Sequence, residues 1–252
     1  MPGSTGLQGR VFALLLLVLL VLPGGACLSS LEAQTEPIRV TIEKNNGDST
    51  VGFLLKASER AILWKYTPES PSSNTTALAE IKEIEFDQPE DWPVAVAAYN
   101  RADFDEAQQA FGAIADRYVE IVLLKGNPSA EARYFQVECL RQLGKFDGIG
   151  PLLDEATVAA LKGALPQLRL EQLELNGAWA AAAAEKWEIV DQLVAGYSLP
   201  AETHRVPEMK PMAPSITVQL TYLRGLSTRA KDKPAAALTD FYRTFTLGFG
   251  ND

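Results

Sequence analysis

Hydrophobic and polar positions divide the chain into three stretches, each with its own spacing. Residues 11–22 are all apolar. Residues 38–86 contain short segments in which apolar and polar positions alternate, which is the period of a half-buried β-strand. After residue 91 the alternation ends, and apolar positions recur three and seven residues apart, as on one face of a helix. The spacing predicts an α+β protein in separate domains, with a small β-barrel-like module at 36–88 and an all-α region at 91–252.

The apolar run has the properties of a secretory signal peptide. Arg10 precedes it, and Pro23 and two glycines follow it, in the order of charge, apolar segment and small residues that signal peptides use. Its twelve residues are fewer than the roughly 20 that a transmembrane helix needs, and Pro23 would break such a helix. We expect residues 1–33 to be a signal peptide cleaved between residues 26 and 33. The protein would then be exported to the periplasm or cell envelope, and an uncleaved signal that anchors it in the membrane is the alternative.

A lipid anchor is a second alternative. The sequence Gly24-Gly25-Ala26-Cys27 resembles a bacterial lipobox, in which the cysteine becomes the lipidated first residue. The usual leucine three places before the cysteine is replaced here by Gly24. The resemblance implies a lipid-anchored envelope assembly factor with Cys27 as its anchor.

Four short strands are predicted in the β-module, and turns separate them. The alternating segments are residues 38–43, 51–56, 61–66 and 79–86, with a turn at 45–48 and a polar loop at 68–76. Gly52 can relieve crowding where a strand bends sharply. Trp64 and Tyr66 alternate with Lys65, so we expect both rings to pack inward.

This order of strands and turns resembles Sm-like and SH3-like barrels. Many Sm-like proteins bind RNA, so an RNA-binding module is an alternative that the resemblance implies. The cations of the module lie scattered among acidic residues and form no basic cluster; they are Lys44, Lys56, Arg60, Lys65 and Lys82. A structural or protein-docking role is therefore favoured for this module.

The helical region repeats a short motif in which an aromatic residue follows a polar turn. The motif occurs at 102–104, 144–146 and 185–187, and Pro234 takes the aromatic position in a fourth copy. These positions are 42, 41 and 47 residues apart. The repeat predicts about four helical hairpins, whose first helices are expected at 92–101, 130–143, 167–184 and 215–230. Gly225 and Ala178 are expected where the two helices of a hairpin cross closely.

The first copy resembles a tetratricopeptide repeat (TPR). The likeness rests on residues 98–107, which begin Ala-Tyr and continue through Asp103-Phe104 to Ala107, and on Phe111 after them. The family repeats every 34 residues, and insertions at 120–128 and 199–214 lengthen the repeats here. A strand module followed by such hairpins also looks like exported bacterial repeat proteins. The resemblance implies a TPR-like solenoid whose first helices line a concave groove for a protein or peptide.

The inner-face spacing of the first helices picks out ten candidate groove residues. Aromatic residues and arginine dominate protein interfaces, and amide side chains can bind a peptide backbone. The candidates are Trp92, Tyr99, Asn100, Tyr134, Glu138, Arg141, Gln142, Trp179, Tyr222 and Arg229. We expect Asn100, Arg141 and Arg229 to be exposed, and Trp92 and Trp179 to lie either in the core or on the surface.

Composition and charge narrow the classes of function. The formal net charge of −9 argues against nucleic acid as a partner. Two cysteines and one histidine are too few for a zinc cage, and Cys139 is expected to be a small buried hydrophobe. His204 is expected on the surface of a proline-rich loop, and no phosphate-binding, dinucleotide-binding or paired-histidine motif is present. The sequence thus predicts a non-enzymatic protein-binding scaffold without cofactor or metal.

Overall fold

A computed structural model describes residues 37–197, 199 and 214–248 of this chain. The expected signal peptide, Cys27 and His204 lie outside the described residues, as does most of the insertion at 199–214. Over the described ranges, no helix combines the length and the hydropathy that spanning a membrane requires.

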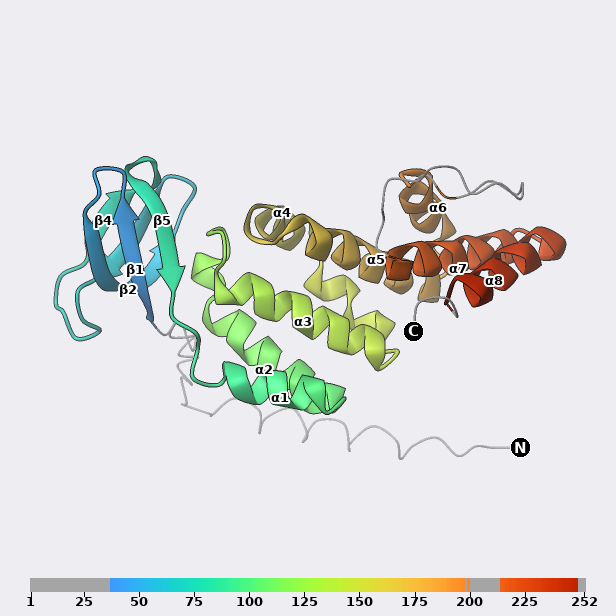
Figure 1. The fold of residues 1–252 in the computed structure, drawn as a ribbon, viewed down its shortest axis with the longest axis horizontal. Helices are drawn as coiled ribbons and strands as arrows, with labels where there is room; N and C mark the ends of the chain where they lie inside the picture. Colours follow the sequence, from blue (N-terminus) through green and yellow to red (C-terminus); the bar gives the residue numbers. More distant parts are fainter. Residues whose placement is uncertain (1–36, 198, 200–213, 249–252) are drawn as a thin grey trace, which may run out of the picture. The chain divides into compact units, whose positions relative to one another are not determined.

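The N-terminal part of the described chain is one antiparallel sheet of five strands (Figure 1). The strands are β1 (Ile38–Lys44), β2 (Ser49–Ala57), β3 (Ala61–Lys65), β4 (Asn74–Ala77) and β5 (Ile81–Phe86). Their order across the sheet is β4-β3-β2-β1-β5. The expected fourth strand begins late, at Ile81, because the 3₁₀ helix η1 (Leu78–Glu80) precedes it.

Strand β4 lies in the segment that the sequence predicted as a loop, so that prediction was wrong. The strand is short and polar, and alternation of apolar residues does not mark it. It forms because it pairs with β3, with Asn74 opposite Trp64 and Thr76 opposite Ile62. The indole Nε1 of Trp64 also donates a hydrogen bond of 3.0 Å to the hydroxyl of the buried Thr76.

Trp64 packs inward as predicted, whereas Tyr66 does not. Trp64 is 4% exposed, but Tyr66 is 61% exposed because β3 ends at Lys65, one residue before it. Position 52 requires a glycine because the indole of Trp64 leaves no room for a side chain there. A Cβ atom at Gly52 would lie 2.5 Å from Cε3 of Trp64 and 2.8 Å from the carbonyl oxygen of Lys65.

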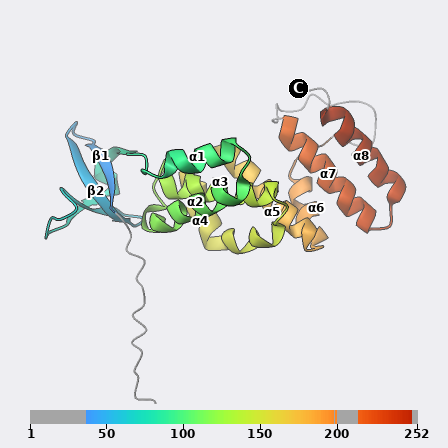
Figure 2. The ribbon, with the colours of Figure 1, turned by 90° about the horizontal axis from the view of Figure 1, so that it is seen from below.

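Eight α-helices follow the sheet in the described residues (Figures 1 and 2). They are α1 (Trp92–Asn100), α2 (Phe104–Arg117), α3 (Pro128–Gln142), α4 (Glu155–Ala164), α5 (Gln167–Ala183), α6 (Trp187–Ala195), α7 (Pro214–Ala230) and α8 (Pro234–Gly248). The four predicted first helices are α1, α3, α5 and α7, with bounds within two residues of those expected.

The predicted repeat appears in the backbone as one turn that occurs four times. Ala102, Gly144, Glu185 and Asp232 each have a positive φ, between 56° and 68°. Each of them stands two residues before the aromatic or proline position of its motif. Because non-glycine residues rarely adopt this conformation, its recurrence at equivalent positions shows that the four turns are structurally equivalent.

The second turn is not followed by a continuous helix, contrary to the prediction. The chain forms two 3₁₀ helices, η3 (Phe146–Gly148) and η4 (Gly150–Leu152), before α4 begins. Two glycines and Pro151 within five residues account for this, since both residue types disfavour helix interiors. Ile149 still points into the core and is fully buried.

Buried side chains of the sheet and of α1 to α3 form one hydrophobic core. It contains Val40, Ile42 and Leu54 of the sheet together with Phe111 of α2 and Ala132 of α3. The 3₁₀ helix η2 (Val119–Ile121), which follows α2, contacts β2 directly. The sheet is therefore packed against the first helices through shared apolar contacts.

Close packing of the last two helices follows the prediction for Gly225. A Cβ atom at Gly225 of α7 would lie 2.7 Å from the ring of Phe241 of α8. Ala178 of α5 is likewise buried, at 2% exposure.

Candidate binding surface on the first helices

All ten candidate groove residues lie on the first helices of the pairs, and they fall into three groups by exposure. Trp92 and Glu138 are buried. The half-buried group is Tyr99, Tyr134, Arg141 and Trp179, and the exposed group is Asn100, Gln142, Tyr222 and Arg229. The two groups that a partner can reach therefore come from α1, α3, α5 and α7.

Trp92 belongs to the core. Its ring meets Phe111 edge-on at 5.4 Å and Phe135 at 6.2 Å between ring centroids. The sequence left its role open between core and surface, and these contacts assign it to the packing of α1 on α2 and α3.

Glu138 of α3 is the centre of a buried polar cluster. Its Oε2 accepts from Nε of Arg141 at 3.0 Å and from Nδ2 of Asn176 at 3.2 Å. Its Oε1 accepts from Nε2 of Gln142 at 3.0 Å and from Nη2 of Arg141. The carboxylate is thus fully paired, which a buried charge requires.

Arg141 is held by this cluster and is half-buried, although the sequence predicted an exposed side chain. The hydrogen bond to the Glu138 carboxylate raises the pKa of Arg141, and burial opposes that effect. The guanidinium is therefore already engaged within α3, where it neutralises Glu138.

A chain of amide side chains continues from this cluster across α5 to α7. Asn176 is fully buried, and its Oδ1 accepts from Gln172 at 3.0 Å. Nε2 of Gln219 on α7 donates to Gln172 at 3.4 Å, and Oε1 of Gln219 accepts from the indole of Trp179 at 3.0 Å. These contacts join the first helices of three successive pairs.

Sequence reasoning missed Asn176, Gln172 and Gln219. The helical spacing of the sequence could have identified the two residues of α5, because positions 172 and 176 lie on the same helix face as the candidate Trp179. Gln219 could have been identified in the same way, because it precedes the candidate Tyr222 by three residues and so shares its face of α7.

Four aromatic rings form a second connection between the pairs. Trp179 stacks on Phe146 at 5.8 Å and on Tyr222 at 5.6 Å between centroids. Tyr222 in turn meets Phe241 at 5.4 Å. The stack places half-buried Trp179 between neighbouring repeats and leaves one edge of Tyr222 in solvent.

Tyr99 and Tyr134 complete the N-terminal part of the surface. The ring of Tyr99 meets Phe104 at 5.6 Å and Phe135 at 5.3 Å. Burial, followed by the negative charge of Glu138, raises the pKa of Tyr99 to about 12. The ring of Tyr134 lies beneath the guanidinium of Arg169, at 5.3 Å from its centroid, so α5 also contacts this part of α3.

The raised pKa of Tyr99 predicts a loss of stability at high pH. A group whose pKa is higher in the folded state stabilises the fold fully below its unfolded pKa, about 10 for tyrosine. That contribution decreases as the pH rises from 10 through 12. We expect the free energy of unfolding of the wild type to fall more steeply over this range than that of Tyr99→Phe.

The measurement is denaturant unfolding at a series of pH values, with tyrosinate absorbance as a second readout. The Tyr99→Phe variant should lose one tyrosine from the late part of the titration. If both proteins give the same dependence on pH, Tyr99 ionises as a solvated phenol.

The described residues provide little for metal or nucleophilic chemistry. No three histidine, cysteine, aspartate or glutamate side chains among them gather as a metal site. Cys139 is fully buried, as predicted, and burial raises the pKa of its thiol to about 12. A thiol with this pKa is protonated at neutral pH and is a weak nucleophile.

One cavity in the described chain has a volume of about 580 Å³. It lies beside the break in the second pair, where Phe146 and Leu153 face the small residues Gly177, Ala180 and Ala181 of α5. Asp147 and Lys186 also line it, so an occupant would meet apolar side chains and one charge of each sign.

Comparison with known proteins finds no match for this chain among protein-family models, curated proteins or solved structures.

Proposed function

We propose that this protein is an exported, non-enzymatic scaffold that binds a protein or peptide through the first helices of TPR-like hairpins. The observation that carries the proposal is the series of hydrogen-bonded side chains that links α3, α5 and α7. Asn176 reaches Glu138, and Gln219 reaches both Gln172 and Trp179. These contacts support a continuous surface made by successive first helices, which is the surface that TPR proteins use for binding.

The buried and exposed members of this surface have different roles in the proposal. Buried Glu138 and Asn176 are hydrogen-bonded to each other, and half-buried Gln172 donates to Asn176. A buried polar network whose groups are satisfied fixes the relative positions of helices. The exposed residues Asn100, Gln142, Tyr222 and Arg229 stand on the same helices. The exposed side chains would contact the partner, and the buried side chains would fix the relative positions of the helices that carry them.

The site of action proposed is the bacterial envelope. The support is the sequence of residues 1–33, with its apolar run and small residues before Cys27. A lipid-anchored assembly factor remains the second candidate, since Cys27 follows a lipobox-like tripeptide. Mass spectrometry of the mature N-terminus separates the two, because lipidated Cys27 adds the mass of its acyl chains and Cys27→Ala abolishes that addition.

The binding proposal is tested by crosslinked capture from the envelope fraction of the native host. The first-helix variant carries Asn100→Ala and Arg229→Ala. The matched control removes one amide and one cation from exposed positions of other helices, with Gln109→Ala and Lys162→Ala. Because all four side chains are exposed, both variants should keep nearly the thermal stability of the wild type.

A protein recovered equally by the wild type and the control, and at least about tenfold less by the first-helix variant, supports the proposal. Recovery by the first-helix variant that equals that of the wild type contradicts the proposal. A loss of recovery that is equal in the first-helix variant and the control also contradicts it, because the loss is then not specific to the first helices.

A further inference from the structure

The second helices of the first and third pairs each pack on the first helix of the next pair. In the first pair, α2 packs on α3, and a Cβ atom at Gly112 would lie 2.6 Å from Nε2 of Gln136. In the third pair, α6 packs on α7, where Ser227 donates to Asp191 at 2.6 Å and Lys231 pairs with the same carboxylate. A first helix therefore has a defined place on which the preceding second helix is seated.

The corresponding place on α5 is the cavity of about 580 Å³ beside the break in the second pair. On α3 the contact lies eight residues before the turn residue with positive φ, and on α7 the contacts lie five residues and one residue before it. On α5 these offsets give Gly177, Ala180 and Ala184, and all three line the cavity. The 3₁₀ helices η3 and η4 stand where a continuous second helix would begin, so this place is left partly open.

The lining of the cavity suits the apolar face of a helix. Leu153 lines it from the side of the break, and Ile189 of α6, which is 49% exposed, also lines it. From α5 the cavity receives only glycine and alanine, so no large side chain of α5 obstructs it. Grooves of this kind bind amphipathic helices whose large apolar residues recur at i, i+3, i+4 and i+7.

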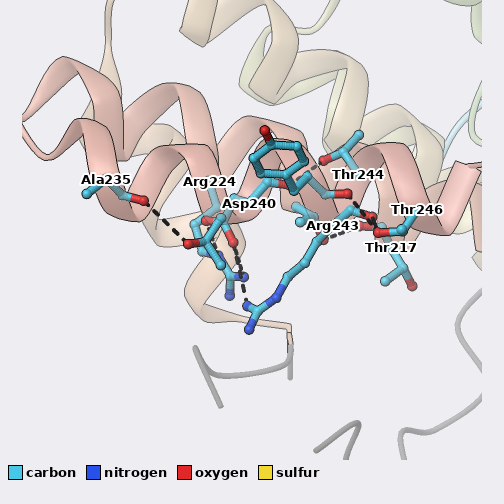
Figure 3. Close-up of polar contacts among 10 residues, drawn as sticks. Thr217, Arg224, Ala235, Asp240, Arg243, Thr244 and Thr246 are labelled. Carbon is cyan, nitrogen blue, oxygen red and sulfur yellow. Dashed lines mark hydrogen bonds and ion pairs between the residues drawn. The ribbon is translucent and has the colours of Figure 1, made fainter. Parts of the chain in front are cut away.

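The break also leaves an acidic side chain without the cation that its equivalents have. On α2, α6 and α8, one carboxylate forms an ion pair with a cation of another element. These pairs are Asp105 with Lys145, Asp191 with Lys231, and Asp240 with Arg224 (Figure 3). Asp147 stands three residues after its turn residue, as Asp105 does, but it has no ion pair within the described part of the chain.

Unpaired charges make the rim of the cavity acidic. Asp147 and Lys186 line the cavity, and Glu185 and Glu188 stand close to Lys186 in the chain. All four side chains are exposed, and among the described residues none of them has an ion pair. Three carboxylates thus oppose one ammonium group, in a chain whose formal net charge is −9. Charge complementarity favours a partner with a basic polar face.

We propose that this cavity is the docking site for a basic amphipathic helix of a partner protein. The partner helix lies along α5 in the place of a second helix, with its large apolar residues in the cavity and a lysine or arginine near Asp147. This site is additional to the first-helix surface, because none of the exposed candidates Asn100, Gln142, Tyr222 and Arg229 lines it.

The probes are two fluorescein-labelled peptides with the apolar face of α2, the helix that fills the equivalent place on α3. The acidic peptide has the sequence of residues 104–117. The lysine peptide carries Asp105→Lys, Glu106→Lys and Asp116→Lys, all at positions that are exposed in α2. Both have a staple between the exposed positions 109 and 113, because isolated helices of this length are marginal in water.

Fluorescence anisotropy with the full chain, at about 0.15 M salt, measures binding of both peptides. We expect the lysine peptide to bind with a dissociation constant below about 100 µM. It should bind at least about tenfold more tightly than the acidic peptide, which has the same apolar face and the opposite charge.

Filling the cavity tests where the peptide binds. Ala180→Leu with Ala184→Leu places larger side chains in the cavity and should weaken binding of the lysine peptide at least about tenfold. The matched control, Ala97→Leu with Ala113→Leu, adds the same side chains at exposed positions of α1 and α2 and should leave binding unchanged. Thermal unfolding checks that both variants keep the fold.

A charge reversal tests the same location without changing the packing. Asp147→Lys should weaken binding of the lysine peptide at least about threefold. Glu59→Lys makes the same change at an exposed position between β2 and β3 and should have little effect. The variant with Asn100→Ala and Arg229→Ala should bind the peptide as the wild type does, so this test and the capture experiment can fail independently.

Four outcomes overturn the proposal. Absence of saturable binding by either peptide excludes a helix as the occupant. Equal binding of the two peptides excludes a basic partner. Wild-type affinity in the cavity-filled variant assigns the binding to another part of the chain. An effect of Asp147→Lys no larger than that of Glu59→Lys excludes the contact at Asp147.

Discussion

Replacement of Arg141 by methionine is expected to lower the free energy of unfolding by about 3 kcal/mol. The carboxylate of Glu138 is 8% exposed, and Arg141 supplies the only cation bonded to it among the described contacts. Without Arg141 the negative charge stays buried and is bonded only by the amides of Gln142 and Asn176. Removing one partner of a buried ion pair destabilises a protein far more than the pair itself stabilises it.

Urea unfolding at neutral pH measures this loss, and a surface pair provides the matched control. Arg101 approaches Glu106 at 3.4 Å with both side chains at least half exposed. Arg101→Met should therefore change the stability by less than about 1 kcal/mol. If both substitutions cost the same, Glu138 is solvated after Arg141 is removed.

A double substitution separates the charge from the packing. Glu138→Gln with Arg141→Met removes both charges, so we expect it to be more stable than Arg141→Met alone. Recovery would show that the loss of stability in Arg141→Met comes from the unpaired charge of Glu138. It would also show that Arg141 acts within the fold, so partner capture is better tested at the exposed positions.

The sequence predicted the element types well because their period is local. The four turns with positive φ, from Ala102 to Asp232, stand where the motif placed them. Strand β4 could not be predicted, since its stability comes from pairing with β3 and from the bond between Trp64 and Thr76. The break after Phe146 was foreseeable in principle, because Gly148, Gly150 and Pro151 were visible in the sequence.

For the candidate surface, too, the sequence predicted what depends on neighbouring residues and missed what depends on distant ones. Helical spacing assigned all ten residues to the first helices. It could not tell which of them are buried, because burial depends on the next helix. Glu138 is enclosed by Asn176, which is 38 residues away along the chain, and neither residue signals this contact in its own neighbourhood.

Replacement of Phe111 by alanine is expected to have the largest effect, about 4 kcal/mol, and to unfold sheet and helices together. The ring is fully buried, stacks on Phe135 at 4.9 Å and meets Trp92 edge-on at 5.4 Å. Large-to-small changes of a buried aromatic residue remove its transfer free energy and leave a cavity. Because the core around Phe111 is continuous with Val40 and Leu54 of the sheet, the loss should reach β1 and β2.

Hydrogen exchange distinguishes this shared core from the separate domains that the sequence predicted. If the core is shared, amides of β1 and β2 in Phe111→Ala should exchange faster by the same factor as those of α2 and α3, about 10³ for a loss of 4 kcal/mol. Val190→Ala provides the matched control, since Val190 is equally buried but belongs to the core of α5 to α7. It should leave the exchange of β1 and β2 unchanged. If Phe111→Ala accelerates exchange in α2 and α3 alone, the sheet folds independently and the boundary between residues 88 and 91 is a true domain boundary.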